Sequence, residues 1–224
     1  EAWFQIWSTL PDADDKHPEK PHGFSFVFSS WDCKFKKTAR GADVVGQLWA
    51  VRWPHFYLVD QKRGRWSFIE TCDEVRAAHA EWSALGFDCH SHLIEEAASG
   101  SAIVEVLERE IPGVLRQPVE GGDKINRLIS QTPVIASGCV YIPDKEHHPW
   151  VKDFLGEVLT FPASAEKDQV DAMSQALAFA RKAFASMVYS GDGDDDKGQP
   201  MERLTDARPG YSDDEDEDGE RLFQ

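Results

Sequence analysis

The sequence lacks a long apolar run, a signal peptide and closely paired cysteines. Among its 224 residues no stretch approaches the roughly 20 apolar residues that span a bilayer. The first ten residues, EAWFQIWSTL, have neither a basic start nor a long apolar segment. The four cysteines include no C-x-x-C pair, so zinc-finger spacing is excluded and a disulfide framework is not expected. We therefore expect reduced thiols in a cytosol. Because the chain also begins without Met, we interpret it as a fragment of a longer protein.

Several motifs of enzyme families are missing as well. Neither G-x-x-x-x-G-K-[ST] nor G-x-G-x-x-G occurs, so we do not expect this chain to hydrolyse nucleotides. No Ser-His-Asp arrangement, nucleophile elbow or internal repeat can be identified. Nothing resembles a recognition helix or another base-reading module, which argues against sequence-specific reading of nucleic acid.

Negative charge is abundant but unevenly distributed. The net charge is −16, and residues 191–224 contain 13 acids and 4 bases, which leaves −9 in this tail and −7 in the body. The tail is poor in apolar residues and cannot bury enough surface to fold alone. We expect a disordered acidic tail over 191–224, after a domain over 24–190.

The body is predicted to be an α/β domain built on a mixed sheet. Residues 1–23 are expected to form an N-terminal helix and a linker. Three strand-like runs follow, at 24–31, 43–51 and 55–60, and the last leads into a basic turn, QKRGR. Helices and strands then alternate up to a last long helix. Three successive strands followed by this alternation favour a mixed sheet with helices on both faces.

Acidic residues stand at the ends of three predicted elements. Asp32 closes the first strand, and Glu95 with Glu96 closes a later one. Asp168 and Asp171 begin the last helix three residues apart, which places them on neighbouring positions of one face. If the fold brings these acids together, they are suited to Mg²⁺, which binds a few carboxylates together with water and phosphate oxygens. Each acid also has a simpler interpretation as a helix cap, a turn residue or an exposed charge.

Histidines give a weaker signal. His90 and His92 are spaced as an H-x-H metal pair on one face of a strand, but no third ligand is implied nearby. We interpret them as surface histidines. His147 and His148, just before Pro149, are interpreted as a helix entry.

Several motifs, in order, resemble the C-terminal nuclease domain of tailed-bacteriophage large terminases, the DNA-packaging motor proteins. The segment SSWDCKFKKTARGADVVGQLWAV is similar to the S-W-D-x-x-x-K strand of that family with its later Asp. LIEEAASGSAIVEVL is similar to I-E-D-x-A-x-G-x-x-I, and GGDKINRL to G-D-K-x-x-R. WVKDFLGEVLTFPASAEKDQVDAMSQAL is similar to W-x-x-x-F-x-x-E-x-x-x-F-P followed by D-D-x-x-D-A. The resemblance covers residues 1–184.

The resemblance implies an RNase H-like fold and a two-metal endodeoxyribonuclease that uses Mg²⁺ or Mn²⁺ to cut concatemeric viral double-stranded DNA during packaging. Carried over by position, Asp32 matches the first metal-binding acid, Glu95 the second and Asp168 the third, with Asp171 as a further metal ligand. One departure is Glu166-Lys167, where the family often has a paired Asp or a His. A lysine there would either weaken the second metal site or contact phosphate.

Basic residues near these acids are predicted to contact the DNA backbone as point charges. A solvated basic face is the alternative interpretation of the hairpin residues and of those that follow Asp32. The predicted DNA-binding residues are Lys34, Lys36, Lys37, Arg40, Lys62, Arg63, Arg65 and Lys124.

The same resemblance implies partners and a cellular place. The ATPase part would lie outside this chain, and the expected partners are DNA, the portal protein and the small terminase subunit. The domain would be monomeric alone and oligomeric on the portal, in the cytoplasm of the bacterial host. Two alternatives stay open, another RNase H-like nuclease (a resolvase or transposase core) and a non-catalytic docking module of the packaging motor.

Overall fold

A computed structural model describes residues 2–11, 22–33, 42–96, 100–118 and 122–190. By its internal contacts the chain divides into two units, Glu1–Phe184 and Ala185–Gln224. Of the second unit, only residues 185–190 are described, and they end the last helix. None of the helices in the described ranges is long and apolar enough to cross a membrane.

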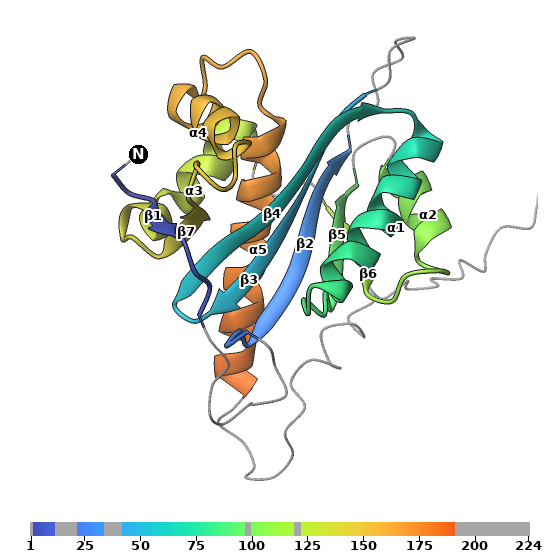
Figure 1. The fold of residues 1–224 in the computed structure, drawn as a ribbon, viewed down its shortest axis with the longest axis horizontal. Helices are drawn as coiled ribbons and strands as arrows, with labels where there is room; N and C mark the ends of the chain where they lie inside the picture. The colour runs from blue at the N-terminus through green and yellow to red at the C-terminus, as the bar shows by residue number, and fades with distance from the viewer. Residues whose placement is uncertain (1, 12–21, 34–41, 97–99, 119–121, 191–224) are drawn as a thin grey trace, which may run out of the picture. The chain divides into compact units, whose positions relative to one another are not determined.

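One mixed sheet of seven strands organises the first unit (Figure 1). Its spatial order is β1-β7-β4-β3-β2-β5-β6. The β2, β3 and β4 strands pair antiparallel, whereas the pairs β2/β5, β5/β6, β4/β7 and β1/β7 are parallel. The strands are β1 (Gln5–Trp7), β2 (Phe26–Cys33), β3 (Ala42–Arg52), β4 (His55–Trp66), β5 (Ser91–Glu95), β6 (Val114–Gln117) and β7 (Val140–Pro143).

Helices cover both faces of this sheet (Figure 1). They are α1 (Phe68–Ala84), α2 (Gly100–Leu107), α3 (Lys124–Ala136), α4 (Val151–Thr160) and α5 (Asp168–Ser190). One core lies between the sheet and α1 with α2, and includes Trp31 and Trp82. A second core lies between the sheet and α3, α4 and α5, and includes Phe28, Phe154 and Leu177. The predicted mixed α/β sheet flanked on both faces is therefore confirmed.

The two central strands β2 and β5 are buried along almost their whole length, so their polar side chains are buried as well. All five residues of β5 are buried, and so are seven of the eight residues of β2, because each strand has neighbours on both sides and helices on both faces. Any polar side chain in these strands must therefore find a partner within the fold. This requirement applies directly to Asp32, His92 and Glu95.

The N-terminal prediction of a helix is wrong, because residues 5–7 form the edge strand β1. Gln5, Ile6 and Trp7 pair with β7, and the Trp7 indole donates a hydrogen bond to the Leu58 carbonyl at 3.0 Å. Phe4 is buried in the second core. Pairing with the sheet and burial of these side chains outweigh the helical spacing of a segment that is too short to be stable as an isolated helix.

The predicted basic turn is also wrong, because Gln61–Arg65 continue β4. Asp43 pairs with Arg65 and Val44 with Gly64, so the β3/β4 ladder runs past the predicted end of the strand. Gly64 is needed for close approach rather than for a turn. A Cβ at this position would lie 2.4 Å from the Trp66 ring.

Candidate metal centre

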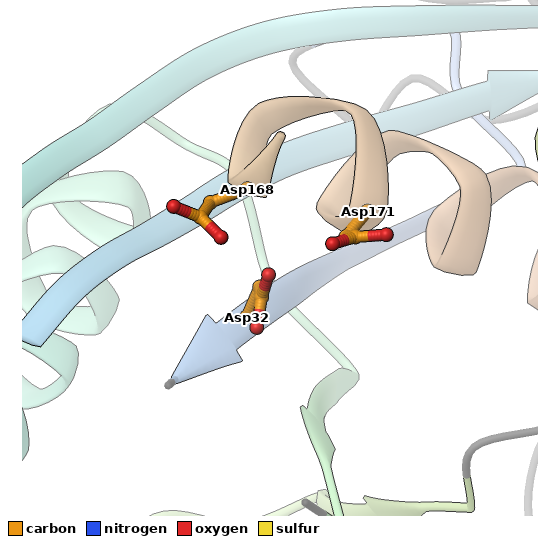
Figure 2. Close-up of side chains that lie close together, drawn as sticks. All are labelled: Asp32, Asp168 and Asp171. Carbon is orange, nitrogen blue, oxygen red and sulfur yellow. The ribbon is translucent and has the colours of Figure 1, made fainter. Parts of the chain in front are cut away.

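Three aspartates from two elements converge at the end of β2 (Figure 2). Asp32 is the penultimate residue of β2, Asp168 is the first residue of α5, and Asp171 lies one turn further along that helix. One carboxylate oxygen from each of the three lies within 4.8 Å of the others. All three residues are buried. The arrangement is a compact set of hard oxygen ligands of the kind that divalent cations prefer.

Hydrogen bonds fix the helix against the strand that carries Asp32. Ser30, two residues before Asp32 and on the same face of β2, donates from Oγ to the Ala172 carbonyl at 2.8 Å. Gln175 in turn donates from Nε2 to Ser30 Oγ at 3.1 Å. Because Ala172 follows Asp171 directly, these bonds hold the first turns of α5 beside the end of β2.

Glu95 joins this cluster through an arginine. Arg127 of α3 donates from Nη1 to Glu95 Oε1 at 2.6 Å and from Nη2 to Asp171 Oδ1 at 3.1 Å. The exposed fractions of the side chains are only 14% for Arg127, 4% for Glu95 and 2% for Asp171. The second oxygen of Glu95 is buried and accepts no hydrogen bond from the described residues. The neighbouring Glu96 is exposed, as its simpler interpretation predicts.

Two cations of α3 face the acids. Lys124 pairs with Asp171 Oδ2 through its ammonium group, one helical turn before Arg127. Burial alone would lower the pKa of Arg127, but the hydrogen bond to Glu95 and the charges of Asp171, Glu95 and Asp32 raise it above the ordinary value. Arg127 is therefore a permanent positive charge among the carboxylates.

A second acidic group shares one residue with the first. Carboxylate oxygens of Asp43, Glu166 and Asp168 also lie within 4.8 Å of one another. Arg65 donates from Nε to Asp43 Oδ1 at 2.7 Å beside this group. Asp168 belongs to both clusters and lies where they meet. Asp43 and Glu166 stand in motifs quoted from the sequence, but neither was predicted to belong to the site.

The predicted DNA-binding residues divide into two sets. Four of them lie outside the described residues: Lys34, Lys36, Lys37 and Arg40. The other four are engaged in ion pairs within the fold. Lys62 contacts Glu81 at 2.8 Å and Asp60 at 3.2 Å, Arg63 lies 3.8 Å from Glu157, and Arg65 and Lys124 contact Asp43 and Asp171 as described above.

The interpretation of His92 as a surface residue is wrong. His92 is fully buried on the α1 face of β5, where its Nδ1 lies 2.8 Å from Ser29 Oγ and its Nε2 lies 3.0 Å from His79 Nδ1. Burial, with a smaller contribution from His79, lowers the pKa of His92 to about 3. Its partner in the predicted pair, His90, is exposed.

Besides Asp43 and Glu166, sequence reasoning missed two more residues of the site. Arg127 stands in the quoted GGDKINRL segment, and its spacing of three from Lys124 was the available signal that both lie on one helical face. Glu157 stands in the quoted WVKDFLGEVLTFP segment without an assigned role. In the structure it is buried and reaches the start of α5.

The fold was compared with those of known proteins. A scan of protein-family models and a search of curated proteins returned no match. Among solved structures, the large terminase of a thermophilic bacteriophage is similar, at 10% sequence identity and a TM-score of 0.53 over 80% of this chain. The chain spans 43% of that protein, less than half of its length.

Two isolated nuclease domains are similar over most of their own length. The human cytomegalovirus terminase nuclease domain matches at 12% identity and a TM-score of 0.54, covering 70% of this chain and 83% of that one. Another structure of that domain was soaked with Mn and has an inhibitor bound. The large terminase nuclease of thermophilic phage G20c, with bound zinc, matches at 15% identity and a TM-score of 0.51, covering 79% and 94%. The chain therefore has the RNase H-like fold of large terminase nuclease domains.

Proposed function

We propose that this chain is the nuclease domain of a viral DNA-packaging terminase and that it hydrolyses phosphodiester bonds of double-stranded DNA with the help of divalent cations. The observation that carries this proposal is the convergence of Asp32, Asp168 and Asp171 where β2 ends and α5 begins. The fold shared with terminase nuclease domains supports it.

The donor set fits Mg²⁺ or Mn²⁺. Every candidate ligand is a carboxylate oxygen, and such oxygens suit hard divalent cations better than soft ones. The buried Oε2 of Glu95, which accepts no hydrogen bond from the described residues, is an atom whose burial a cation would offset. We take the two acidic groups that share Asp168 as the candidate sites of two ions. When bound, the ions would activate water for attack and stabilise the leaving oxygen of the scissile phosphodiester.

The side chains of the chain itself have distinct roles in this proposal. Asp32 and Asp168, fixed by β2 and by the first turn of α5, would hold the cations. Glu95 and Asp171 complete the negative set, and Arg127 bridges the two carboxylates and offsets their mutual repulsion. Lys124, whose side chain is 35% exposed, can leave Asp171 and contact a backbone phosphate as a point charge.

The wider role follows from the resemblance to large terminases. We propose that the domain cuts concatemeric viral DNA, together with an ATPase part that this chain does not contain, on a portal assembly that also involves the small subunit. The place of this reaction would be the cytoplasm of the bacterial host. Since the body has a net charge of −7, we expect the isolated domain to bind DNA weakly and to lose binding in salt.

The test is cleavage of a supercoiled plasmid by the isolated chain. The chain, its Asp32→Ala variant and a control with the exposed Asp88 changed to Asn are incubated with Mg²⁺, Mn²⁺ or EDTA. The proposal predicts nicked and linear products only with metal, from the unchanged chain and Asp88→Asn but not from Asp32→Ala. Cutting in EDTA, or undiminished cutting by Asp32→Ala, would contradict it.

The alternatives give different results in the same assay. A preference for branched DNA or a strand-transfer product would favour a resolvase or transposase core. If no protein cuts, Mn²⁺ binding decides the matter. Bound metal would indicate a nuclease that needs the rest of its motor, whereas no binding would indicate a docking module.

A further inference from the structure

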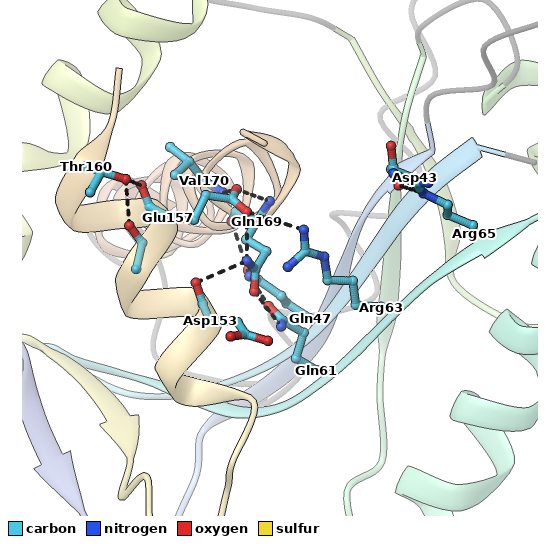
Figure 3. Close-up of polar contacts among 11 residues, drawn as sticks. Asp43, Gln47, Gln61, Arg63, Arg65, Asp153, Glu157, Thr160, Gln169 and Val170 are labelled. Carbon is cyan, nitrogen blue, oxygen red and sulfur yellow. Dashed lines mark hydrogen bonds and ion pairs between the residues drawn. The ribbon is translucent and has the colours of Figure 1, made fainter. Parts of the chain in front are cut away.

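A buried carboxylate of α4 caps the start of α5. Glu157 is 6% exposed, and its Oε1 accepts hydrogen bonds from the backbone amides of Gln169 at 2.8 Å and Val170 at 3.2 Å (Figure 3). The first amides of a helix have no partner within the helix, and the positive end of the helix dipole favours a negative group there. Glu157 thus supplies from another helix the cap that α5 would otherwise need from its own sequence.

The same carboxylate ends a chain of buried side-chain amides. The indole of Trp49 donates to Gln47 Oε1 at 3.2 Å, and Gln47 Nε2 donates to Gln61 Oε1 at 2.9 Å. Gln61 Nε2 donates to Gln169 Oε1 at 2.8 Å, and Gln169 Nε2 donates to Glu157 Oε2 at 2.7 Å (Figure 3). All five side chains belong to buried residues.

The chemistry of the two ends fixes the direction of this amide chain. An indole N–H only donates and an ionised carboxylate only accepts, whereas each glutamine does both. With these ends, each of the three amides has one orientation that satisfies its neighbours. Two further contacts agree with that orientation, because Gln47 Nε2 also donates to the backbone carbonyl of Gln169 at 3.2 Å and Gln169 Nε2 lies 3.5 Å from the backbone carbonyl of Asp153.

The amide chain connects the helix that carries two acids with the strands beside the third. Gln47 and Gln61 are direct partners in the β3/β4 ladder. Asp32 of β2 is paired with Val45 of β3, two residues from Gln47 and on the same face of the strand. The start of α5 and the end of β2 are therefore both attached to the same β3/β4 ladder, one through the amide chain and the other through strand pairing.

We propose that Glu157, Gln169, Gln61 and Gln47 are positioning residues of the metal centre. Their one-way hydrogen-bond chain sets the first turn of α5, and with it Asp168 and Asp171, at the distance from Asp32 that a cation requires. This inference rests on the proposed function. It adds that a carboxylate at position 157 is required for its acceptor character and not for its shape.

The direct variant is Glu157→Gln, which keeps the shape of the side chain but replaces an acceptor oxygen at the end of the amide chain with a donor NH₂ group. Its new amide group faces the amide group of Gln169, donor against donor, and no rotation of the three native glutamines satisfies both ends. We expect hydrogen exchange at the amides of Gln169 and Val170 to become on the order of tenfold faster. Misplaced ligands should weaken Mn²⁺ binding by about tenfold or more.

A second substitution should restore the amide chain. In the double variant Glu157→Gln, Gln61→Glu, the new side-chain amide at position 157 donates to a rotated Gln169, which then donates to the carboxylate at position 61. That carboxylate still accepts from Gln47, and the bond from Trp49 is kept. Within the amide chain only the long contact to Asp153 is lost, and outside it the 3.8 Å ion pair between Arg63 and Glu157. In Gln61→Glu alone, the new carboxylate faces the side-chain oxygen of Gln169, acceptor against acceptor. This variant should therefore lose as much Mn²⁺ affinity and amide protection as Glu157→Gln. The double variant should recover slow exchange and Mn²⁺ affinity to within about threefold of the unchanged chain.

The control is Ser29→Ala, which removes two buried hydrogen bonds on the opposite face of the sheet, one to His92 and one from the Trp31 indole. All variants are compared by thermal unfolding, by amide exchange and by Mn²⁺ titration. An equal loss of Mn²⁺ affinity in Ser29→Ala would show a general effect of stability and overturn the inference. Failure of the double variant to recover, whether it folds or not, would also overturn it. If the unchanged chain binds no Mn²⁺, the proposed function fails, and the amide exchange, which needs no metal, still decides the positioning of α5.

Discussion

Arg127 should stabilise the metal-free protein because it neutralises buried carboxylates. Its guanidinium contacts Glu95 at 2.6 Å and Asp171 at 3.1 Å, and these carboxylates are 4% and 2% exposed. Removal of one partner of a buried ion pair costs roughly 3–5 kcal/mol, because a buried charge is left unpaired. Lys124 continues to pair with Asp171 in Arg127→Met. We therefore expect the lower end, a loss of about 3 kcal/mol in the free energy of unfolding in EDTA.

Metal should reverse part of this loss. Under the proposed function, a cation in the unchanged chain would compete with Arg127 for Glu95 and Asp171, whereas in Arg127→Met it would not. A ligand at 100 times its dissociation constant stabilises the folded state by about 2.7 kcal/mol. Mn²⁺ should therefore raise the unfolding free energy of Arg127→Met by more than that of the unchanged chain.

Urea unfolding in EDTA and in Mn²⁺ measures both effects. The matched control is Arg76→Met, which removes an arginine that contacts Asp73 and Glu110 at the surface. Exposed pairs of this kind contribute at most about 1 kcal/mol. The stabilising role of Arg127 is refuted if Arg127→Met loses no more stability in EDTA than Arg76→Met, or if Mn²⁺ stabilises Arg127→Met and the unchanged chain equally.

Two further predictions concern the fold around the site. The pKa of His92 is about 3 in the folded state and about 6.5 in the unfolded state. As the pH falls below 6.5, the unfolded state therefore binds a proton that the folded state does not. This lowers the free energy of unfolding by about 2 kcal/mol at pH 5. Urea unfolding at pH 7 and pH 5 measures this loss, and the difference in unfolding free energy between the two pH values should be smaller in His92→Gln. An equal difference in the variant would show that His92 is not its source. Gly46→Ala should lower the unfolding free energy by about 1–3 kcal/mol, because the new Cβ would lie 2.4 Å from the Trp31 ring. A melting temperature equal to that of the unchanged chain would show that Trp31 can move aside.

The parts of the site that depend on local pattern were predictable from sequence. An apolar run that ends in Asp32 identifies a buried strand with an acid at its end. The spacing of three between Asp168 and Asp171 places both on one face of a helix. The order of the motifs then indicated the RNase H-like fold, which the structure confirms. Whether Asp32, Glu95 and Asp168 are the metal-binding acids stays a prediction.

The features that sequence could not give depend on contacts between distant segments. Gln47, Gln61 and Gln169 are spaced as ordinary polar positions, and only the fold places them in one buried amide chain. His92 is buried because β5 lies between β2 and β6, which no local pattern reveals. The basic run that ends at Arg65 is typical of an exposed turn, but the long β3/β4 ladder keeps it extended.

The most direct test of the central claim is the position of bound metal. Crystals of this chain soaked in Mn²⁺ allow the metal to be located by its anomalous scattering. We predict a peak among the carboxylates of Asp32, Asp168 and Asp171 that disappears in Asp32→Ala. A peak at some other place, or none at an Mn²⁺ concentration that supports cleavage, would contradict the proposed metal centre.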